Sequence, residues 1–355
     1  MTHKPTGTPK ENGYRMPAEW AQHTATWIAW PHNPQDWPGK FQPIPWVYAD
    51  IVRHLSSVED VHILVNDAAA EQRAQKNLSR AGANLARVHF HPWPTNRVWT
   101  RDSGPIFVRN AGTGSAAITN WKFNAWAKYD DWQLDDQIPA RTAKLLKLPE
   151  WTPRFNNKRI VLEGGSIDTN GVGTLLTTEE CLLSEVQQRN PGLSRADLEQ
   201  VFHDYLGIDQ VLWLNRGIAG DDTHGHVDDI TRFVAENGIV TVTEPNRDDE
   251  NHLPLAENLD RLRSARNLQG KPFEIFELPM PAPVVFEGQR LPASYGNFYI
   301  ANKLVLVPTF NDANDRLALN TLAKLFPARI VIGIHCGDFI WGLGALHCMT
   351  QQQPL

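Results

Sequence analysis

The hydrophobic and polar positions of this chain recur as pairs of strands. Four segments each contain two runs of alternating apolar residues, joined by a short turn that carries Asn or Gly. This alternation is typical of β-hairpins that bury one face. The predicted hairpins are residues 104–121, 164–178, 229–245 and 297–310, and their starts lie 60, 65 and 68 residues apart.

Segments with the 3.6-residue period of an amphipathic helix separate these hairpins. After the helical segment comes a further short apolar run, as in residues 210–215 and 329–334. The repeating unit is therefore strand, strand, helix, strand. The predicted helices are residues 135–148, 195–207 and 252–268.

A fifth copy of the unit is predicted at the start of the chain. Residues 23–31 and 60–66 have strand character and flank a helical segment, and the final segment, residues 338–350, is expected to return and complete the array. Closing such units into a ring limits the number of exposed sheet edges. We therefore predict an α/β fold, a cyclic array of five repeats in one domain over residues 1–355, rather than two domains.

The composition indicates the cellular compartment and the classes of partner that the protein can bind. The hydrophobic content of 41% and charged content of 21% are ordinary for a folded protein. A net charge of -6 argues against nucleic acid as a partner and suits a cationic ligand. Three scattered cysteines (Cys181, Cys336 and Cys348) fit a reducing compartment, and the first 20 residues lack the apolar core of a signal peptide. We expect a cytoplasmic protein that binds neither membrane nor nucleic acid, with homo-oligomerisation left open.

Polar motifs stand where the predicted hairpins begin. Equivalent ends of the repeats converge in a cyclic array, so we expect these side chains to share one pocket. The candidates are Asp102 in "VWTRDSGP", Glu163 in "VLEGGSID", His226 and Asp228 in "GDDTHGHVDD", Asn297 in "ASYGNFYIAN" and Cys348 in "GLGALHCMT".

Two chemistries compete for these residues. The H-x-H-x-D pattern of His224, His226 and Asp228 could direct alternate side chains to one divalent metal. The other His and Cys residues are not spaced like a zinc site, so we favour thiol catalysis without metal or other cofactor. In that interpretation Cys348 is the nucleophile and His226 the general acid/base.

The carboxylates make sense beside a thiol only if the substrate is a cation, because anions raise the pKa of a thiol. A guanidinium is planar and binds carboxylates through paired N–H groups. Asp102 and Asp228 could hold its N–H edges and present its central carbon to Cys348. The 13 tryptophans leave a third alternative open, a propeller that only binds ligands on aromatic surfaces.

The sequence resembles the agmatine deiminase and bacterial-type peptidylarginine deiminase family of the guanidine-modifying superfamily. The resemblance covers nearly the whole chain. Besides the motifs quoted above, it rests on "RMPAEWAQHTATWIAWPHN", "KFNAW", "VLVPTFNDAND" and "LHCMTQQQP". It implies a five-bladed α/β-propeller of ββαβ repeats with pseudo-fivefold symmetry, the pentein fold.

The resemblance also implies hydrolysis of a guanidinium to a ureido group and ammonia, with a covalent intermediate on Cys348 and no metal. His226 takes the acid/base position, and Asp102 and Asp228 the guanidinium-binding positions, with Glu163 and Asn297 as further substrate-binding residues. The favoured substrate is agmatine, converted to N-carbamoylputrescine on the way to putrescine. Peptidylarginine, giving citrulline, is the alternative. Free arginine is less favoured because no basic residue stands out for its carboxylate.

Two motifs depart from the family pattern in this chain. The residues before the acid/base position are Thr223-His224-Gly225, where the family has T-D-G. The turn before the nucleophile is Gly342-Leu343-Gly344-Ala345-Leu346, where the family has G-G-G-N. We expect both departures to affect recognition of the substrate's tail rather than of its guanidinium.

Overall fold

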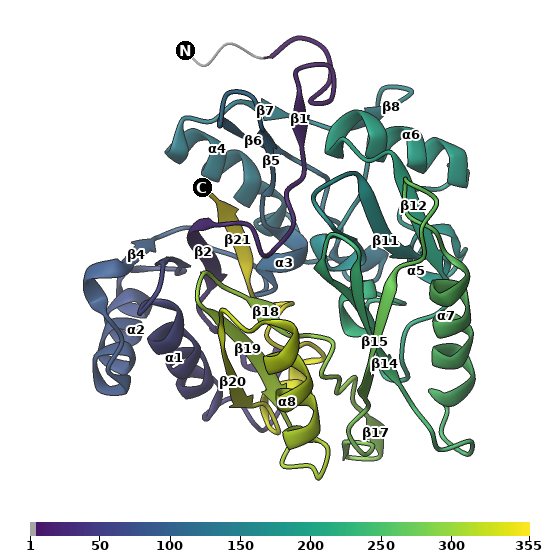
Figure 1. The fold of residues 1–355 in the computed structure, drawn as a ribbon. Helices are drawn as coiled ribbons and strands as arrows, with labels where there is room; N and C mark the ends of the chain where they lie inside the picture. The colour runs from purple at the N-terminus through teal and green to yellow at the C-terminus, as the bar shows by residue number, and fades with distance from the viewer. Residues whose placement is uncertain (1–4) are drawn as a thin grey trace.

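The computed structural model describes residues 5–355. Two predictions include residues 1–4, which lie outside the described range: the single domain over residues 1–355 and the lack of a signal peptide in the first 20 residues. Five sheets of three or four strands make up most of the fold, and helices lie around their periphery (Figure 1). Within residues 5–355, none of the helices combines the length and apolar character that a membrane span requires.

The five sheets share one strand pattern. In four of them an antiparallel pair comes first along the chain, and a strand parallel to its second member follows after a helix. In the fifth, the last strand of the chain (Gln351–Pro354) takes the place of the first member and pairs antiparallel with His23–Ala29. This is the predicted strand, strand, helix, strand order. Three sheets have only these strands: β10 (Asp168–Thr169), β11 (Thr174–Thr178) and β12 (Gln210–Leu214); β13 (Thr231–Ala235), β14 (Gly238–Thr243) and β15 (Glu274–Pro279); and β18 (Tyr299–Ile300), β19 (Leu304–Thr309) and β20 (Ile330–His335).

The other two sheets have an added edge strand. One runs β1 (Tyr14–Arg15), β5 (Ile106–Asn110), β6 (Ala116–Thr119) and β7 (Glu150–Trp151). The other runs β21 (Gln351–Pro354), β2 (His23–Ala29), β3 (Asp60–Leu64) and β4 (Val88–His91). Two small hairpins stand apart, β8 (Arg154–Phe155) with β9 (Lys158–Arg159), and β16 (Val285–Phe286) with β17 (Gln289–Arg290).

Four helices lie in the predicted helical segments, namely one between the first two predicted strands and those near residues 138–146, 195–206 and 252–264, whereas residues 68–81, 100–103 and 179–183 form helices that were not predicted. In α6, the Ser194 hydroxyl accepts from the backbone N–H of Asp197, whose carboxylate accepts from the Ser194 N–H, and Gly207 ends the helix at φ 69°. The helices are α1 (Ile44–Leu55), α2 (Ala68–Ala81), α3 (Thr100–Ser103), α4 (Ile138–Leu146), α5 (Glu179–Leu183), α6 (Arg195–Leu206), α7 (His252–Ser264) and α8 (Asp315–Leu325).

The end of the chain differs from the prediction in one respect. Residues 338–350 were expected to return as the closing segment, but they form a 3-10 turn (Phe339–Gly342) and an irregular loop. The returning strand is β21 (Gln351–Pro354), which pairs antiparallel with β2 and places Gln351 opposite Trp27. Glycines and the left-handed Leu343 (φ 66°) interrupt the extended pattern before Cys348, so the strand begins later.

Candidate active site

The predicted site residues lie just before the first strand of the antiparallel pair in each sheet. Asp102 is in α3 ahead of β5, Glu163 precedes the turn that leads to β10, and His226 and Asp228 precede β13. Asn297 comes directly before β18, and Cys348 lies in the loop before β21. Each of the five large sheets therefore supplies one segment of the site.

His226 lies at the centre of three carboxylates. Its Nδ1 is 3.7 Å from Oδ1 of Asp102 and 4.0 Å from Oδ1 of Asp228, and its Nε2 is 3.9 Å from Oε2 of Glu163. All four side chains are at most 2% exposed. Neither ring nitrogen has a hydrogen-bond partner among the described residues. The imidazole is thus surrounded by carboxylates while both of its nitrogens remain without a hydrogen bond to residues 5–355.

A glycine makes this convergence possible. A Cβ on Gly165 would lie 2.5 Å from Nδ1 of His226, 2.8 Å from Oδ1 of Asp102 and 3.1 Å from Oδ2 of Asp228. The Gly165 N–H donates to Asp102 Oδ1 over 3.1 Å. Only a residue without a side chain lets the backbone approach these three groups so closely.

Cys348 is held against the carboxylates by an amide. The Nδ2 of Asn297 lies 3.1 Å from the Sγ of Cys348 and donates to Oδ1 of Asp229 over 2.9 Å. The Oδ1 of Asn297 accepts from the backbone N–H groups of His347 (2.9 Å) and Cys348 (3.4 Å). These contacts use the whole amide, so in this structure Asn297 orients the thiol. Its predicted contact with substrate stays a prediction.

Asp102 and Cys348 open onto one pocket. The pocket is also lined by the indoles of Trp99 and Trp126 and by Gly344. A Cβ on Gly344 would lie 2.7 Å from the ring of Trp99, so only a glycine lets the backbone pack this closely against Trp99 beside the thiol. The Nε1–H of Trp126 donates to Oδ2 of Asp102 over 2.9 Å. Two tryptophans therefore line the pocket, while most of the others pack in the hydrophobic clusters beneath the sheets.

Burial and charge shift the pKa values of the site residues in different directions. Burial raises the pKa of Asp102 to about 6, although the nearby His226 opposes that rise. Burial would also raise the pKa of Glu163, but the Arg189 guanidinium, 3.1 Å away, and His226 together lower it to about 2. For His226, burial favours the neutral ring, yet the charge of Asp102 and contacts with Cys181 and Glu163 raise its pKa well above 6.5.

Burial and nearby negative charge also oppose ionisation of the Cys348 thiol. Burial, followed by the charges of Asp228, Asp229 and Asp102, raises the pKa of Cys348 well above 9. An incoming cation would screen those charges and favour the thiolate. The free site is thus prepared for a positively charged ligand.

His224 takes no part in this cluster. Its Nε2 lies 3.1 Å from the Ser184 hydroxyl. Within residues 5–355, two groups of His, Cys and carboxylate donors lie within 4.8 Å of one another. They are Glu163, Cys181 and His226, and Asp228, Asp229 and Cys348. Because neither includes His224, the H-x-H-x-D metal interpretation lacks its first ligand.

Sequence analysis did not identify several residues that contact the site. Arg189, which pairs with Glu163, lies in none of the quoted motifs, and Glu19 stands in "RMPAEWAQHTATWIAWPHN" without a role assigned to it. Trp126 stands in the quoted motif "KFNAW" and His347 in "GLGALHCMT", both without a role assigned to them. Their partners lie far away in the chain, so only the fold reveals them.

A basic residue that sequence analysis did not single out also lines the pocket. The guanidinium of Arg97 lies 4.2 Å from the ring centroid of Tyr129. Its terminal nitrogens lie 3.2 Å from Oδ1 of Asp36 and 2.9 Å from Oδ1 of Asp131. Arg97 is therefore already neutralised by two carboxylates.

The fold and the site together define a class. A mixed α/β pentein fold that gathers a cysteine, a histidine and carboxylates around a pocket is the arrangement expected of guanidine-modifying proteins. The chain belongs to the Porphyromonas-type peptidyl-arginine deiminase family, whose model matches residues 15–354.

Relatives within this family are similar over their full length. The agmatine deiminase of Pseudomonas syringae pv. tomato is 34% identical, covering 98% of this chain and 97% of the relative. A putative agmatine deiminase of Legionella pneumophila is 36% identical, covering 98% and 96%. The solved structure of Enterococcus faecalis agmatine deiminase superposes with a TM-score of 0.90 at 30% identity, covering 99% of each chain.

Proposed function

We propose that this protein is an agmatine deiminase, which hydrolyses the guanidinium of agmatine to N-carbamoylputrescine and ammonia. The observation that carries the proposal is the position of the Cys348 thiol, 3.8 Å from Oδ2 of Asp228 in a pocket that Asp102 also lines. A nucleophile surrounded by carboxylates is matched to a cationic carbon centre. Relatives named as agmatine deiminases over the full length support the same substrate.

In the proposed mechanism, Asp102 and Asp228 bind the N–H edges of the guanidinium and place its carbon beside Cys348. The bound cation lowers the cost of releasing the Cys348 proton to the solvent, and the resulting thiolate attacks the carbon to give a tetrahedral adduct. His226, held protonated by the carboxylates, gives a proton to the departing nitrogen. The C–N bond breaks, ammonia leaves, and an amidino-thioether remains on Cys348.

The second half of the reaction reverses the role of the histidine. Neutral His226 takes a proton from a water that adds to the amidino carbon. The C–S bond then breaks, the ureido product leaves, and Cys348 is restored. Glu163 lies 3.9 Å from Nε2 of His226, on the opposite side of the ring from Asp102, and supports the charged form of the ring. Asn297 orients the sulfur in both steps through its 3.1 Å contact.

We further propose that the five large sheets are the blades of one closed α/β-propeller around this site, forming a single domain. The pairing of β21 with β2, which joins the two ends of the chain in one sheet, supports closure. The supply of one site segment by each sheet supports a single functional unit. Three free cysteines are consistent with a cytoplasmic location.

Peptidylarginine is the second candidate substrate, because the matching family model carries that description. Arg97 favours agmatine over free arginine, since its guanidinium is already paired with Asp36 and Asp131 and is not free for a substrate carboxylate. Ammonia release measured side by side with agmatine, free arginine and a blocked arginine peptide tests the assignment. Preference for either arginine compound over agmatine would overturn it.

A further inference from the structure

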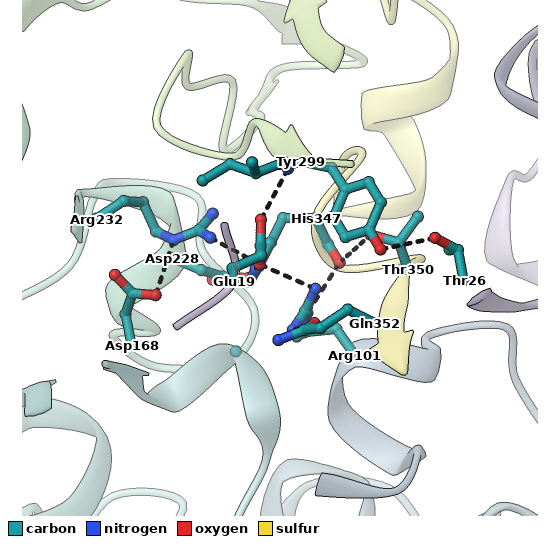
Figure 2. A network of polar contacts seen from close by, with 12 residues as sticks. Glu19, Thr26, Arg101, Asp168, Asp228, Arg232, Tyr299, His347, Thr350 and Gln352 are labelled. Carbon is teal, nitrogen blue, oxygen red and sulfur yellow. Dashed lines mark hydrogen bonds and ion pairs between the residues drawn. The ribbon is translucent and has the colours of Figure 1, made fainter. Parts of the chain in front are cut away.

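His347, the neighbour of Cys348, is clamped between two buried carboxylates. Its Nδ1 lies 2.6 Å from Oδ2 of Asp228, and its Nε2 lies 2.7 Å from Oε2 of Glu19 (Figure 2). The His347 and Glu19 side chains are 2% and 3% exposed, and that of Asp228 is fully buried. An ionised carboxylate only accepts hydrogen bonds, so a ring that serves both oxygens must donate from both nitrogens. With both carboxylates ionised, this geometry uses both ring N–H groups, as in an imidazolium.

The charges around this ring agree with that state. The cluster in Figure 2 contains two guanidiniums, with Arg232 Nη2 2.8 Å and Arg101 Nη2 3.2 Å from Oε2 of Glu19. A third carboxylate, Asp168, lies 3.4 Å from Nε of Arg232. Three carboxylates face two guanidiniums, and a protonated His347 makes the numbers equal. A buried cluster with balanced charge avoids the cost of an unpaired ion.

The clamp acts on one oxygen of Asp228 and leaves the other available. Oδ2 is held by His347, whereas Oδ1 has no hydrogen-bond partner among the described residues. Burial would raise the pKa of Asp228, but the hydrogen bond and charge of His347, with further help from His226 and Arg232, lower it. Asp228 is thus kept ionised and fixed in rotation beside the thiol.

We propose that His347 is a positioning residue, which as a doubly donating imidazolium holds Asp228 in the orientation and charge state that the guanidinium of the substrate requires. It does not exchange protons with the substrate, because both of its nitrogens are occupied. His226, whose nitrogens have no hydrogen-bond partner in residues 5–355, remains the acid/base. This inference rests on the proposed function, since it assigns Asp228 to the substrate.

The test compares His347→Gln with His23→Gln. His23 is a matched control, because its buried imidazole also lies between two acceptors, Glu59 Oε1 (3.3 Å) and the Glu19 carbonyl (2.7 Å), and does not touch Asp228. Loss of a charge-assisted bond predicts a rise of about 10- to 100-fold in KM for agmatine with His347→Gln. For His23→Gln we expect lower thermal stability and an unchanged KM.

The pH profile separates positioning from general damage to the fold. With the imidazolium removed, the pKa of Asp228 rises, so the acid limb of kcat/KM moves to higher pH. His23→Gln should leave that limb in place. The charged and titratable groups that face Asp228 are His347, His226, Arg232, Asp102, Asp229 and Cys348. A folded His347→Gln variant with wild-type KM and acid limb would overturn the proposal.

A spectroscopic measurement on the wild-type protein does not depend on turnover or on a variant that folds. Nitrogen-15 imidazole spectra should show a histidine whose two ring N–H protons are both hydrogen-bonded and exchange slowly, and this signal should be absent in His347→Gln. A singly protonated ring at His347 in the wild type would refute the clamp. If the wild type releases no ammonia from any guanidine compound, the proposed function fails, while these spectra still decide the state of His347.

Discussion

The thiol of Cys348 lies 3.8 Å from Oδ2 of Asp228, and both side chains are buried. A carboxylate at this distance opposes formation of the thiolate, which a cysteine nucleophile needs. The arrangement becomes productive when a cation lies beside both groups. The substrate itself thus supplies the charge that activates its attacker, and five predictions follow from the contacts around this pair.

Replacing Cys348 with serine should remove ammonia release. An alcohol in place of the sulfur is a far weaker nucleophile at neutral pH, so we expect a loss in kcat of about 1,000-fold or more. The measurement is ammonia release from agmatine, with circular dichroism as the check on the fold. Cys336→Ser is the control, because that buried thiol is not among the pocket residues, and its activity should be nearly unchanged. Full activity in Cys348→Ser would refute thiol catalysis.

The free enzyme should react slowly with iodoacetamide at neutral pH. Because burial and the charges of Asp228, Asp229 and Asp102 raise the pKa of the Cys348 thiol well above 9, the alkylation rate should still be rising at pH 9. Asp228→Asn removes a negative charge and lowers that pKa, so its rate at pH 8 should exceed the wild-type rate. Mass spectrometry of the modified peptide measures both rates. A wild-type rate that reaches a plateau below pH 8 would contradict the prediction.

Trp126→Phe should shift the pH dependence of the reaction. The indole N–H donates to Oδ2 of Asp102 over 2.9 Å and favours the ionised carboxylate, whose pKa is about 6. Without this bond the pKa rises, so kcat/KM should fall off at a higher pH as the solution is acidified. Trp121→Phe removes a similar buried bond, to the Thr119 hydroxyl, outside the pocket, and should leave the acid limb unchanged. Equal acid limbs in all three proteins would count against a role for this bond.

Gly165→Ala should disable the site while preserving the fold. The added methyl group would lie 2.5 Å from Nδ1 of His226 and 2.8 Å from Oδ1 of Asp102, so these groups must separate. Displacement of an acid/base residue by about 1 Å costs on the order of 100-fold in rate. Gly112→Ala, whose methyl group meets only Oδ1 of Asn110 at 3.3 Å, is the control and should keep wild-type kcat. Unchanged kcat in Gly165→Ala would show that the close packing is dispensable.

Arg189→Met should destabilise the protein. Arg189 and Glu163 form a fully buried pair at 3.1 Å, and loss of one partner from such a pair costs about 3–5 kcal/mol in the free energy of unfolding. The pKa of Glu163 is lowered to about 2, so its contribution to stability is complete above about pH 4.5 and disappears as the pH falls toward 2. Urea unfolding at pH 7 gives the difference. The control is Arg263→Met, which breaks an exposed pair with Glu277 and should lower the free energy of unfolding by less than about 1 kcal/mol. An equal loss of unfolding free energy in the two variants would argue against a special role for burial.

Much of the architecture could be predicted from the sequence because it depends on local patterns. Alternation of apolar residues predicted hairpins such as β13–β14, and helical periodicity predicted α6 and α7 close to their observed bounds. The common position of Asp102, His226 and Cys348 in their repeats predicted that they would meet. The start of β21 could not be predicted, because the backbone of Leu343 enters the left-handed region that a leucine rarely adopts.

The supporting residues of the site could not be predicted, because their signals are not local. Glu19 lies in the irregular segment before β2, yet its carboxylate contacts Arg101, Arg232 and His347. Glu19 stands in the quoted motif "RMPAEWAQHTATWIAWPHN", but the motif alone does not show which residues its carboxylate contacts. Buried charges of this kind are determined by which segments the fold brings together.

The pairing of β21 with β2 has a consequence for how the protein is made. Thr24 and Gln353, in contact across these strands, are separated by 329 positions. The sheet that contains β2 therefore cannot be completed until the ribosome has added residues 351–354, and by then Cys348 has been added as well. Interrupted translation products that stop before residue 348 lack the thiol and leave β2 without its edge partner. Such fragments should therefore be inactive, because they lack both the nucleophile and the strand that follows it.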